Sequence, residues 1–466
     1  MTDRVHRMES LLAGFEPDFN FEPAGRIPEA EFADRVEKLR REATVAGHDA
    51  LLIHADSAGK LSPTNGFLHY TCDWNREGVL VVPTDSDREL VLFSFFTETV
   101  LLPPSGEPVG VDSIWQISPV GREFDGRPGT PLAKTVAACA RFLTDLGFAD
   151  GSFGVIGDAT TAKYMAGLKA LLPRARFLDD SSVMRRIQRT RSMNELAQIR
   201  TAAQLADIGY QAACYVTRPG VTDHEIYAAF TYAQLARGGE SGDSYQIGVN
   251  QWGTHCGKPY GHVIRSGDLI NLYISAVTYH GYSAQIARMI AVGDITDDQE
   301  ETLAMCTEAV RRAEVLIRPG VAFKDLHSAA FSAYVERGRL VDDRTSTMPY
   351  NWAAMEDGRP RRIPEGYVPD TDYESQGRRL NHVYPALAGP HNPNLGHAVG
   401  TQGIPKFNVT SHNTDRAEEG MVFVLHAQWL DPMKSGANIG DCYYVTESGY
   451  ENLSRHSSLD TYRVKV

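Results

Sequence analysis

Long apolar runs and paired cysteines are both missing from this 466-residue chain. Without a run of about 20 apolar residues, no segment is expected to span a membrane. The opening MTDRVHRMESLLAGFEPD spreads charges through what would be the apolar core of a signal peptide, so we expect no such peptide. The six cysteines form no CxxC pair, which predicts reduced thiols and a cytoplasmic location.

An excess of positive charge is missing as well. The chain has 46 Lys and Arg against 59 Asp and Glu, a net charge of −13. Nucleic acids and anionic membranes attract basic surfaces, so neither is an expected partner. A hydrophobic content of 42% and a charged content of 23% are typical of globular proteins, and the length predicts two domains.

In the first half of the chain, short apolar runs alternate with helical patterns. Helices are predicted over residues 29–47 and 131–146, and strands over DALLIHA, GVLVVP and ELVLFSF (49–55, 78–83 and 89–95). This alternation indicates an α/β domain around a largely buried sheet. Near Met184 a basic stretch leads into a long amphipathic helix, which Ser192 or Asn194 could cap. We therefore predict one domain over residues 1–184 and a second over 185–466.

The second half contains an internal repeat. RPGVTDHEIYAAF (218–230) returns as RPGVAFKDLHSAAF (318–331), each copy with a helical pattern before and after the Arg-Pro-Gly turn. Two such halves predict a pseudo-twofold domain with helices covering a curved sheet, and a site at the seam. A Pro- and Gly-rich insertion over 348–395 interrupts the second copy. It is either a solvated loop or a lid over the site.

Five further stretches carry a family likeness in a fixed order. They are YQIGVNQWGTHC, GDLINLYISAVTYHGYSAQIAR, NLGHAVG, EEGMVFVLHAQW and IGDCYYVTESGYENLS, which begin at residues 245, 267, 394, 418 and 439. The chain from residue 184 to about 455 resembles the pita-bread fold of methionine aminopeptidase, prolidase and creatinase. The resemblance implies a mixed α/β (α+β) protein, with a creatinase-like α/β domain before a pita-bread catalytic domain.

The resemblance also exposes missing carboxylates. Peptidases of this family bind two metal ions through two aspartates, a histidine and two glutamates. The corresponding residues here are Tyr273, Gln285, His397, His426 and Gly440, so only the histidine is kept. A pair of divalent ions is not expected without anionic oxygen ligands, and neither is a mechanism based on a metal pair.

Creatinase is the member that works without metal, and the chain resembles it more closely. Its catalytic histidine lies in a Gly-Xaa-His turn that matches His255. Its N-terminal domain reaches across a homodimer with an aromatic and an arginine that hold the substrate carboxylate, and Cys72, Trp74 and Arg76 fall on that stretch. Glutamates that bind the guanidinium of creatine are replaced by Ala287 and His426, which predicts a neutral or anionic group in place of the cation.

The individual side chains allow functional and structural interpretations. His255 suits general acid/base catalysis, or only a loop hydrogen bond. His397 suits substrate orientation or oxyanion stabilisation, or a structural role. His426 suits a second proton-transfer group, or a core histidine paired with Tyr273. Tyr273 and Gln285 are expected to fill the vacated metal volume and to make a polar contact.

Together these features predict a metal-independent, creatinase-like hydrolase that cleaves a C–N or neighbouring bond in a small carboxylate-bearing molecule. Arg76, supplemented by Lys406, would hold the carboxylate, and the partner subunit's N-terminal domain would complete the site. Three alternatives remain open: a lyase that performs elimination or decarboxylation, one zinc or iron ion bound by the three histidines, and a non-catalytic module that binds small molecules or peptides.

Overall fold

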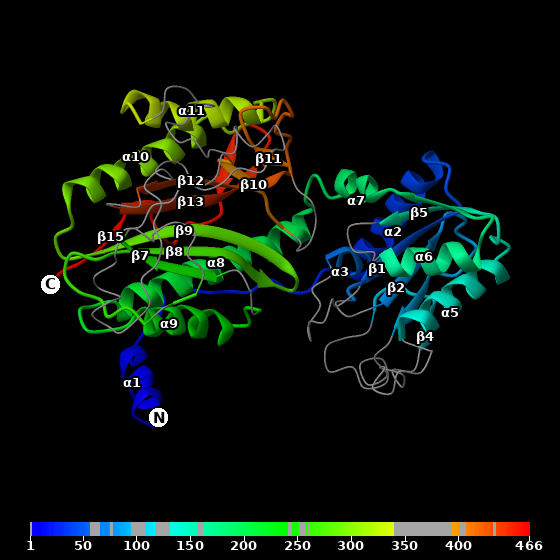
Figure 1. Cartoon of the computed structure of the whole chain (residues 1–466), viewed down its shortest axis with the longest axis horizontal. Coiled ribbons are helices and arrows are strands. Elements are labelled where there is room, and N and C mark those ends of the chain that lie inside the picture. Colours follow the sequence, from blue (N-terminus) through cyan, green and yellow to red (C-terminus); the bar gives the residue numbers. More distant parts are fainter. Residues whose placement is uncertain are drawn as a thin grey trace, which may run out of the picture. The chain divides into compact units, whose positions relative to one another are not determined.

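We describe the fold from a computed structural model. The structure describes residues 2–55, 66–74, 78–94, 108–116, 131–156, 162–240, 245–250, 258–259, 261–339, 394–400, 407–431 and 435–466. The chain divides into two compact units, of which one consists mainly of Arg26–Arg189 and the other of Met1–Gly25, Thr190–Gly400 and Lys406–Val466. Each unit has its own sheet and core (Figure 1).

The smaller unit is an α/β domain around a six-stranded sheet in the order β4-β3-β2-β1-β5-β6. Apolar residues of β1 alternate between two clusters, because successive side chains of a strand point to opposite faces. The strands are β1 Ala50–Ala55, β2 Gly78–Pro83, β3 Val91–Ser94, β4 Ser113–Gln116, β5 Ser152–Ile156 and β6 Arg176–Asp179. The helices are α2 Glu29–Val45, α3 Gly66–Cys72, α5 Pro131–Asp145, α6 Ala162–Leu171 and α7 Ser181–Ile187.

The larger unit contains the two repeat copies around a nine-stranded sheet. Its main path is β11-β10-β12-β13-β9-β8-β7, with β14 on β13 and β15 on β9. The strands are β7 Tyr245–Val249, β8 Leu269–Tyr279, β9 Tyr282–Val292, β10 Gly396–Ala398, β11 Asn408–Val409, β12 Val422–Asp431, β13 Ser435–Val445, β14 Tyr450–Asn452 and β15 Tyr462–Val464. The helices are α1 Thr2–Leu12, α8 Met193–Val216, α9 Asp223–Leu235, α10 Asp297–Glu314 and α11 Phe323–Glu336.

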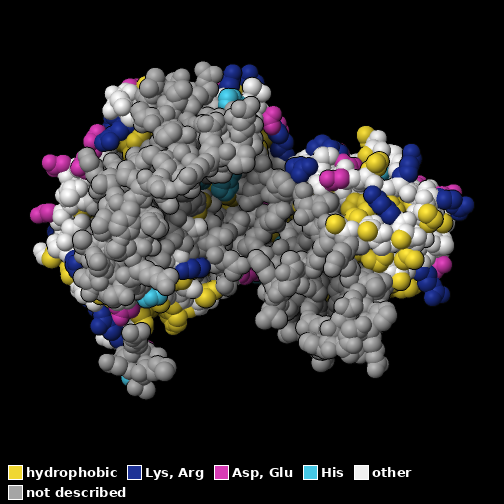
Figure 2. Space-filling view, viewed as in Figure 1, with side chains coloured by type: hydrophobic (Ala, Val, Ile, Leu, Met, Phe, Trp, Pro, Cys, Tyr) yellow, Lys and Arg dark blue, Asp and Glu magenta, His cyan; other side chains and the backbone are white. Residues whose placement is uncertain are grey.

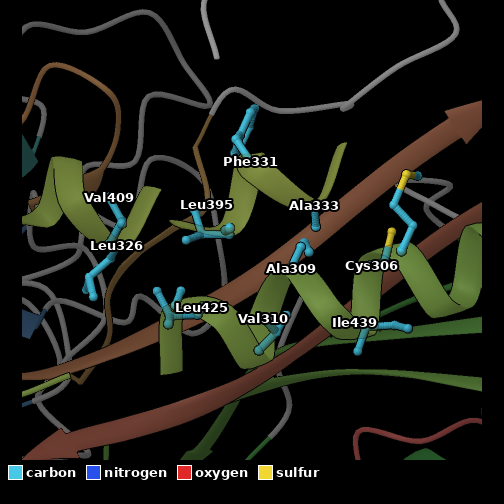
Figure 3. Packing of buried hydrophobic residues seen from close by; sticks show 14 of the residues in the cluster. Cys306, Ala309, Val310, Leu326, Phe331, Ala333, Leu395, Val409, Leu425 and Ile439 are labelled. Carbon is cyan, nitrogen blue, oxygen red and sulfur yellow. The ribbon is translucent and has the colours of Figure 1, made fainter. Parts of the chain in front are cut away.

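Each repeat copy contributes a helix pair and neighbouring strands to this unit. The copies supply α8 and α9 beside β8 and β9, and α10 and α11 beside β12 and β13 (Figure 1). Ser192, one of the two predicted caps, accepts a hydrogen bond from the Glu195 amide and opens α8 with a capping box. Figure 3 shows Val310 of α10 and Phe331 of α11 in the core that these helices share with Leu425 and Ile439 of the sheet.

A buried ionic network joins α8, the sheet and the C-terminal segment. The Arg288 guanidinium is fully buried and donates to Asp441, to the Gly440 carbonyl at 2.6 Å and to Ser457 Oγ at 3.0 Å. Ser457 donates in turn to Asp207 of α8. Ala287 and Gly440 are paired across β9 and β13 and share one face of the sheet. Arg288 and Asp441 each follow one of these two residues, so they lie on the opposite face.

Asp207 makes the stability of this unit depend on pH. Burial raises the pKa of its carboxyl to about 7, although the charge of Arg288 and the hydrogen bonds from Ser457 and His456 act to lower it. From about pH 4 to pH 7 the folded protein therefore keeps a proton that the unfolded chain has released, so the free energy of unfolding is expected to fall as pH rises, by up to about 1.4 kcal/mol per pH unit. Urea unfolding of Asp207→Asn should lose this slope, whereas the exposed Asp150→Asn should keep it. An equal slope in both variants would contradict this origin.

Among the described residues, no helix is both long and apolar enough to cross a membrane. The five described cysteines are all buried and without disulfides. Acidic and basic side chains are interspersed over the described surface in Figure 2. The cytoplasmic location stays a prediction.

Candidate active site

One row of residues crosses four neighbouring strands of the larger sheet. Tyr273 pairs with Ala287, Ala287 with Gly440, and Gly440 with His426. Paired residues of neighbouring strands point to the same face, so these positions share one side of the sheet. Gln285, two residues before Ala287, lies on that face as well. We call Tyr273, Ala287, Gly440 and His426 the central row.

His397 joins the same face from β10. It pairs with Val424, which lies two residues before His426. A Cβ on Gly396 would lie 1.9 Å from the Val424 carbonyl oxygen, so the glycine is what lets β10 lie so close to β12. The ring centroids of His397 and His426 are 5.5 Å apart.

The predicted filling of the metal volume has a defined geometry. Gln285 Nε2 donates to Tyr273 Oη at 2.9 Å, and both side chains are buried. The Tyr273 ring lies 5.9 Å from that of His426, centroid to centroid. Burial raises the pKa of the Tyr273 hydroxyl to about 12, against the lowering effect of the Gln285 hydrogen bond. Tyr273 therefore remains protonated near neutral pH.

The hydrogen-bond partners of the two histidines select opposite tautomers of the neutral rings. His397 Nδ1 lies 3.0 Å from the Ala398 carbonyl oxygen, which can only accept, so Nδ1 carries a proton and the lone pair of the neutral ring is on Nε2. His426 Nδ1 lies 2.9 Å from Gln428 Nε2, which can only donate, so His426 carries its proton on Nε2. One ring thus accepts a proton at Nε2 and the other donates one.

The central row does not fit a pair of divalent ions. Its side chains and Gln285 supply a phenol, an amide and an imidazole, and His397 adds a second imidazole, with no carboxylate among them. Position 440 has no room for a carboxylate side chain, because a Cβ there would lie 2.3 Å from the Leu425 carbonyl oxygen and 2.5 Å from the Cβ of His426. Within the described residues, no three His, Cys, Asp or Glu side chains are grouped to hold an ion.

Adding a single methyl group at Gly440 is expected to force β12 and β13 apart. Gly440→Ala should lower the free energy of unfolding by about 1–3 kcal/mol, the usual cost of overpacking. Gly449→Ala is the matched control, since a Cβ there meets nothing within 4 Å. Denaturant unfolding compares the two, and equal stability would mean that the strands yield without cost.

The remaining predicted residues have different positions. Cys72 and Trp74 are 0% and 2% exposed and pack into the core of the smaller unit, where burial raises the pKa of the Cys72 thiol to about 12. Their structural contribution is thus packing. His255, Arg76 and Lys406, and residues 348–393 of the insertion, lie outside the described residues, so their roles stay predictions.

A buried cluster at the end of β7 has no counterpart among the residues that the sequence singled out. His262 Nε2 lies 2.8 Å from Asp268 Oδ2, and Asn250 Nδ2 donates to Asp268 Oδ1 at 3.0 Å. Burial acts to raise the pKa of Asp268, but the hydrogen bonds from His262, Asn250 and the Arg265 amide lower it overall. Asn250 adopts a φ of 55° directly after β7, so this cluster fixes the backbone where β7 ends.

The comparisons with known proteins agree with this architecture. Solved structures with the same fold include an X-Pro aminopeptidase from Thermotoga maritima (TM-score 0.69, 17% identity, 92% of this chain and 99% of that one). A prolidase from Thermococcus sibiricus has a TM-score of 0.70 at 14% identity, over 94% of this chain and 100% of that one. The fold and its sheet thus define a two-domain pita-bread protein.

The model of metallopeptidase family M24 matches residues 197–447, and the chain belongs to this family. An uncharacterised hydrolase/peptidase of Sinorhizobium fredii is 31% identical over 41% of this chain and 51% of its own length. An uncharacterised peptidase of Staphylococcus aureus is 24% identical over 60% of this chain and 66% of its own length. The chain thus spans between about half and two thirds of the length of these relatives.

Proposed function

We propose that this protein is a metal-independent, creatinase-like hydrolase that cleaves a C–N or neighbouring bond of a small carboxylate-bearing molecule. The observation that carries the proposal is the pair of histidines held in opposite tautomers beside a row without carboxylates. Family membership supports hydrolysis as the reaction type. A proton acceptor and a proton donor near each other are what hydrolysis needs when no metal activates the water.

The proposed reaction uses each imidazole once. His397 Nε2 accepts a proton from the attacking water while the new C–O bond forms. His426 donates a hydrogen bond from Nε2 to the oxyanion that develops on the attacked carbon. The C–N bond then breaks, and the leaving nitrogen takes its proton from His255. Arg76, two residues after Trp74 in the sequence, reaches across a homodimer and holds the carboxylate together with Lys406.

The alternatives have less support from the geometry. A lyase would use Tyr273 as its acid, but burial raises the pKa of that hydroxyl and makes it a poorer proton donor. A single zinc or iron ion on His426 Nε2 would need the proton on Nδ1, a tautomer that the Gln428 amide group opposes.

A panel of small N-acyl and ureido carboxylates, incubated in heavy-oxygen water, tests the reaction type. Hydrolysis should place the heavy oxygen in the product that carries the attacked carbon, and His255→Ala should lose this activity. An unlabelled alkene product would identify a lyase. Binding without any turnover would identify a non-catalytic module, and either result would overturn the proposal.

A further inference from the structure

A second row of polar side chains lies beside the central row. Two residues further along the strands, Asn271 pairs with Met289 and Gln428 pairs with Asn438. The strand period of two places these side chains on the same face as Tyr273 and His426. We call Asn271, Gln428 and Asn438 the amide row.

The amide row holds polar atoms whose bonding capacity the described part of the chain does not use. Asn271 and Asn438 are 0% exposed and Gln428 is 3% exposed. Within the described structure, both side-chain polar atoms of Asn438, the Oε1 of Gln428 and the Oδ1 of Asn271 have no hydrogen-bond partner. A buried polar atom without a partner costs about 1–3 kcal/mol, so several on one row indicate that a ligand completes them.

The atoms that already have partners define what the row can still bind. Asn271 Nδ2 donates to the Asn438 carbonyl and to the Met289 sulfur, both at 3.1 Å, and Gln428 Nε2 is engaged with His426. Three carbonyl oxygens remain as acceptors, with the Asn438 NH₂ group as the donor. A group with two N–H donors and one carbonyl oxygen complements this set.

Charge narrows the choice of ligand further. The amide row itself is neutral, and the central row beside it has no carboxylate to pair with a cation. A guanidinium or a carboxylate would be desolvated here without a counter-charge, which is costly. We propose that the amide row is a subsite for an uncharged primary carboxamide or ureido group of the substrate, seated next to His426. The proposal rests on the proposed function for its catalytic meaning, and adds a substrate class to it.

Direct binding of small probes tests the subsite without any turnover. Acetamide and N-methylurea should bind the wild-type protein, detected by ligand-observed NMR, at least about tenfold more tightly than acetate or methylguanidinium. Asn438→Leu should lose acetamide binding, while Asn20→Leu, at an exposed asparagine, should keep it. The near-isosteric Asn438→Asp should shift the binding preference at least about tenfold toward methylguanidinium. This variant still tests the subsite if Asn438→Leu fails to fold.

The outcomes separate this proposal from the proposed function. Equal binding of all four probes, no binding of any, or an unchanged preference in Asn438→Asp would overturn the subsite. An amide row filled by ordered water alone would appear as no binding. Acetamide binding that depends on Asn438, in a protein that hydrolyses nothing in the panel, would keep the subsite and overturn the hydrolase.

Discussion

Replacing His397 with alanine is expected to lower kcat/KM by about 10²- to 10⁴-fold on the substrate that the panel identifies, the usual contribution of a positioned general base. The expectation follows from the Ala398 carbonyl, which fixes the proton on Nδ1 and leaves Nε2 to accept one. His426→Ala should cost about 10²- to 10³-fold in kcat, because it removes a donor to the oxyanion. Steady-state kinetics of both variants measure these losses.

Two further variants sharpen this prediction. His224→Ala, at an exposed position of α9, is the matched control and should keep wild-type kinetics. Gln428→Leu should lower kcat less than His426→Ala and alter the pH profile, because the His426 ring loses the group that fixes its tautomer. Near-wild-type turnover of His397→Ala would show that the paired histidines are not the catalytic groups.

Removal of the buried guanidinium is expected to have the largest effect on stability. Arg288→Leu leaves Asp441 buried without its cation, and breaking a buried pair in this way costs about 3–5 kcal/mol. Combining Arg288→Leu with Asp441→Leu should recover part of the loss, because no unpaired charge then remains. Chemical denaturation measures each free energy of unfolding.

An exposed ion pair provides the control for the buried one. Arg463 pairs with Glu300 at 2.6 Å, with both side chains 47% exposed, so Arg463→Ala should cost no more than about 1 kcal/mol. If Arg288→Leu were as mild as Arg463→Ala, the network would not hold the sheet to α8 and the C-terminal segment.

Much of this fold could be predicted from local patterns. The apolar runs of β1 and β2 and the Arg-Pro-Gly repeat are short-range signals, and the structure places the corresponding elements where the patterns predict them. The resemblance aligned Tyr273, Gln285, His397 and His426, and the strand pairing places these four on one face. The family match is independent of the strand pairing and agrees with the predicted fold.

The remaining features depend on pairings between residues far apart in the chain. Gln428 lies only two residues after His426, so the strand period could have placed it on the same face. Its partner Asn438 and the neighbouring Asn271 follow only from the register of four strands. In the same way, no local pattern shows that Trp74 is buried in the core, because its surroundings come from distant strands and helices.

In the proposed function, imidazoles and not a metal pair activate water in this site. Metal analysis of protein purified without added ions, combined with turnover before and after chelation, tests it most directly. We expect less than one metal ion per chain, and a kcat that neither the chelator nor added manganese, cobalt or zinc changes. A pair of ions on each chain, with turnover lost on chelation and restored by the ion, would contradict it.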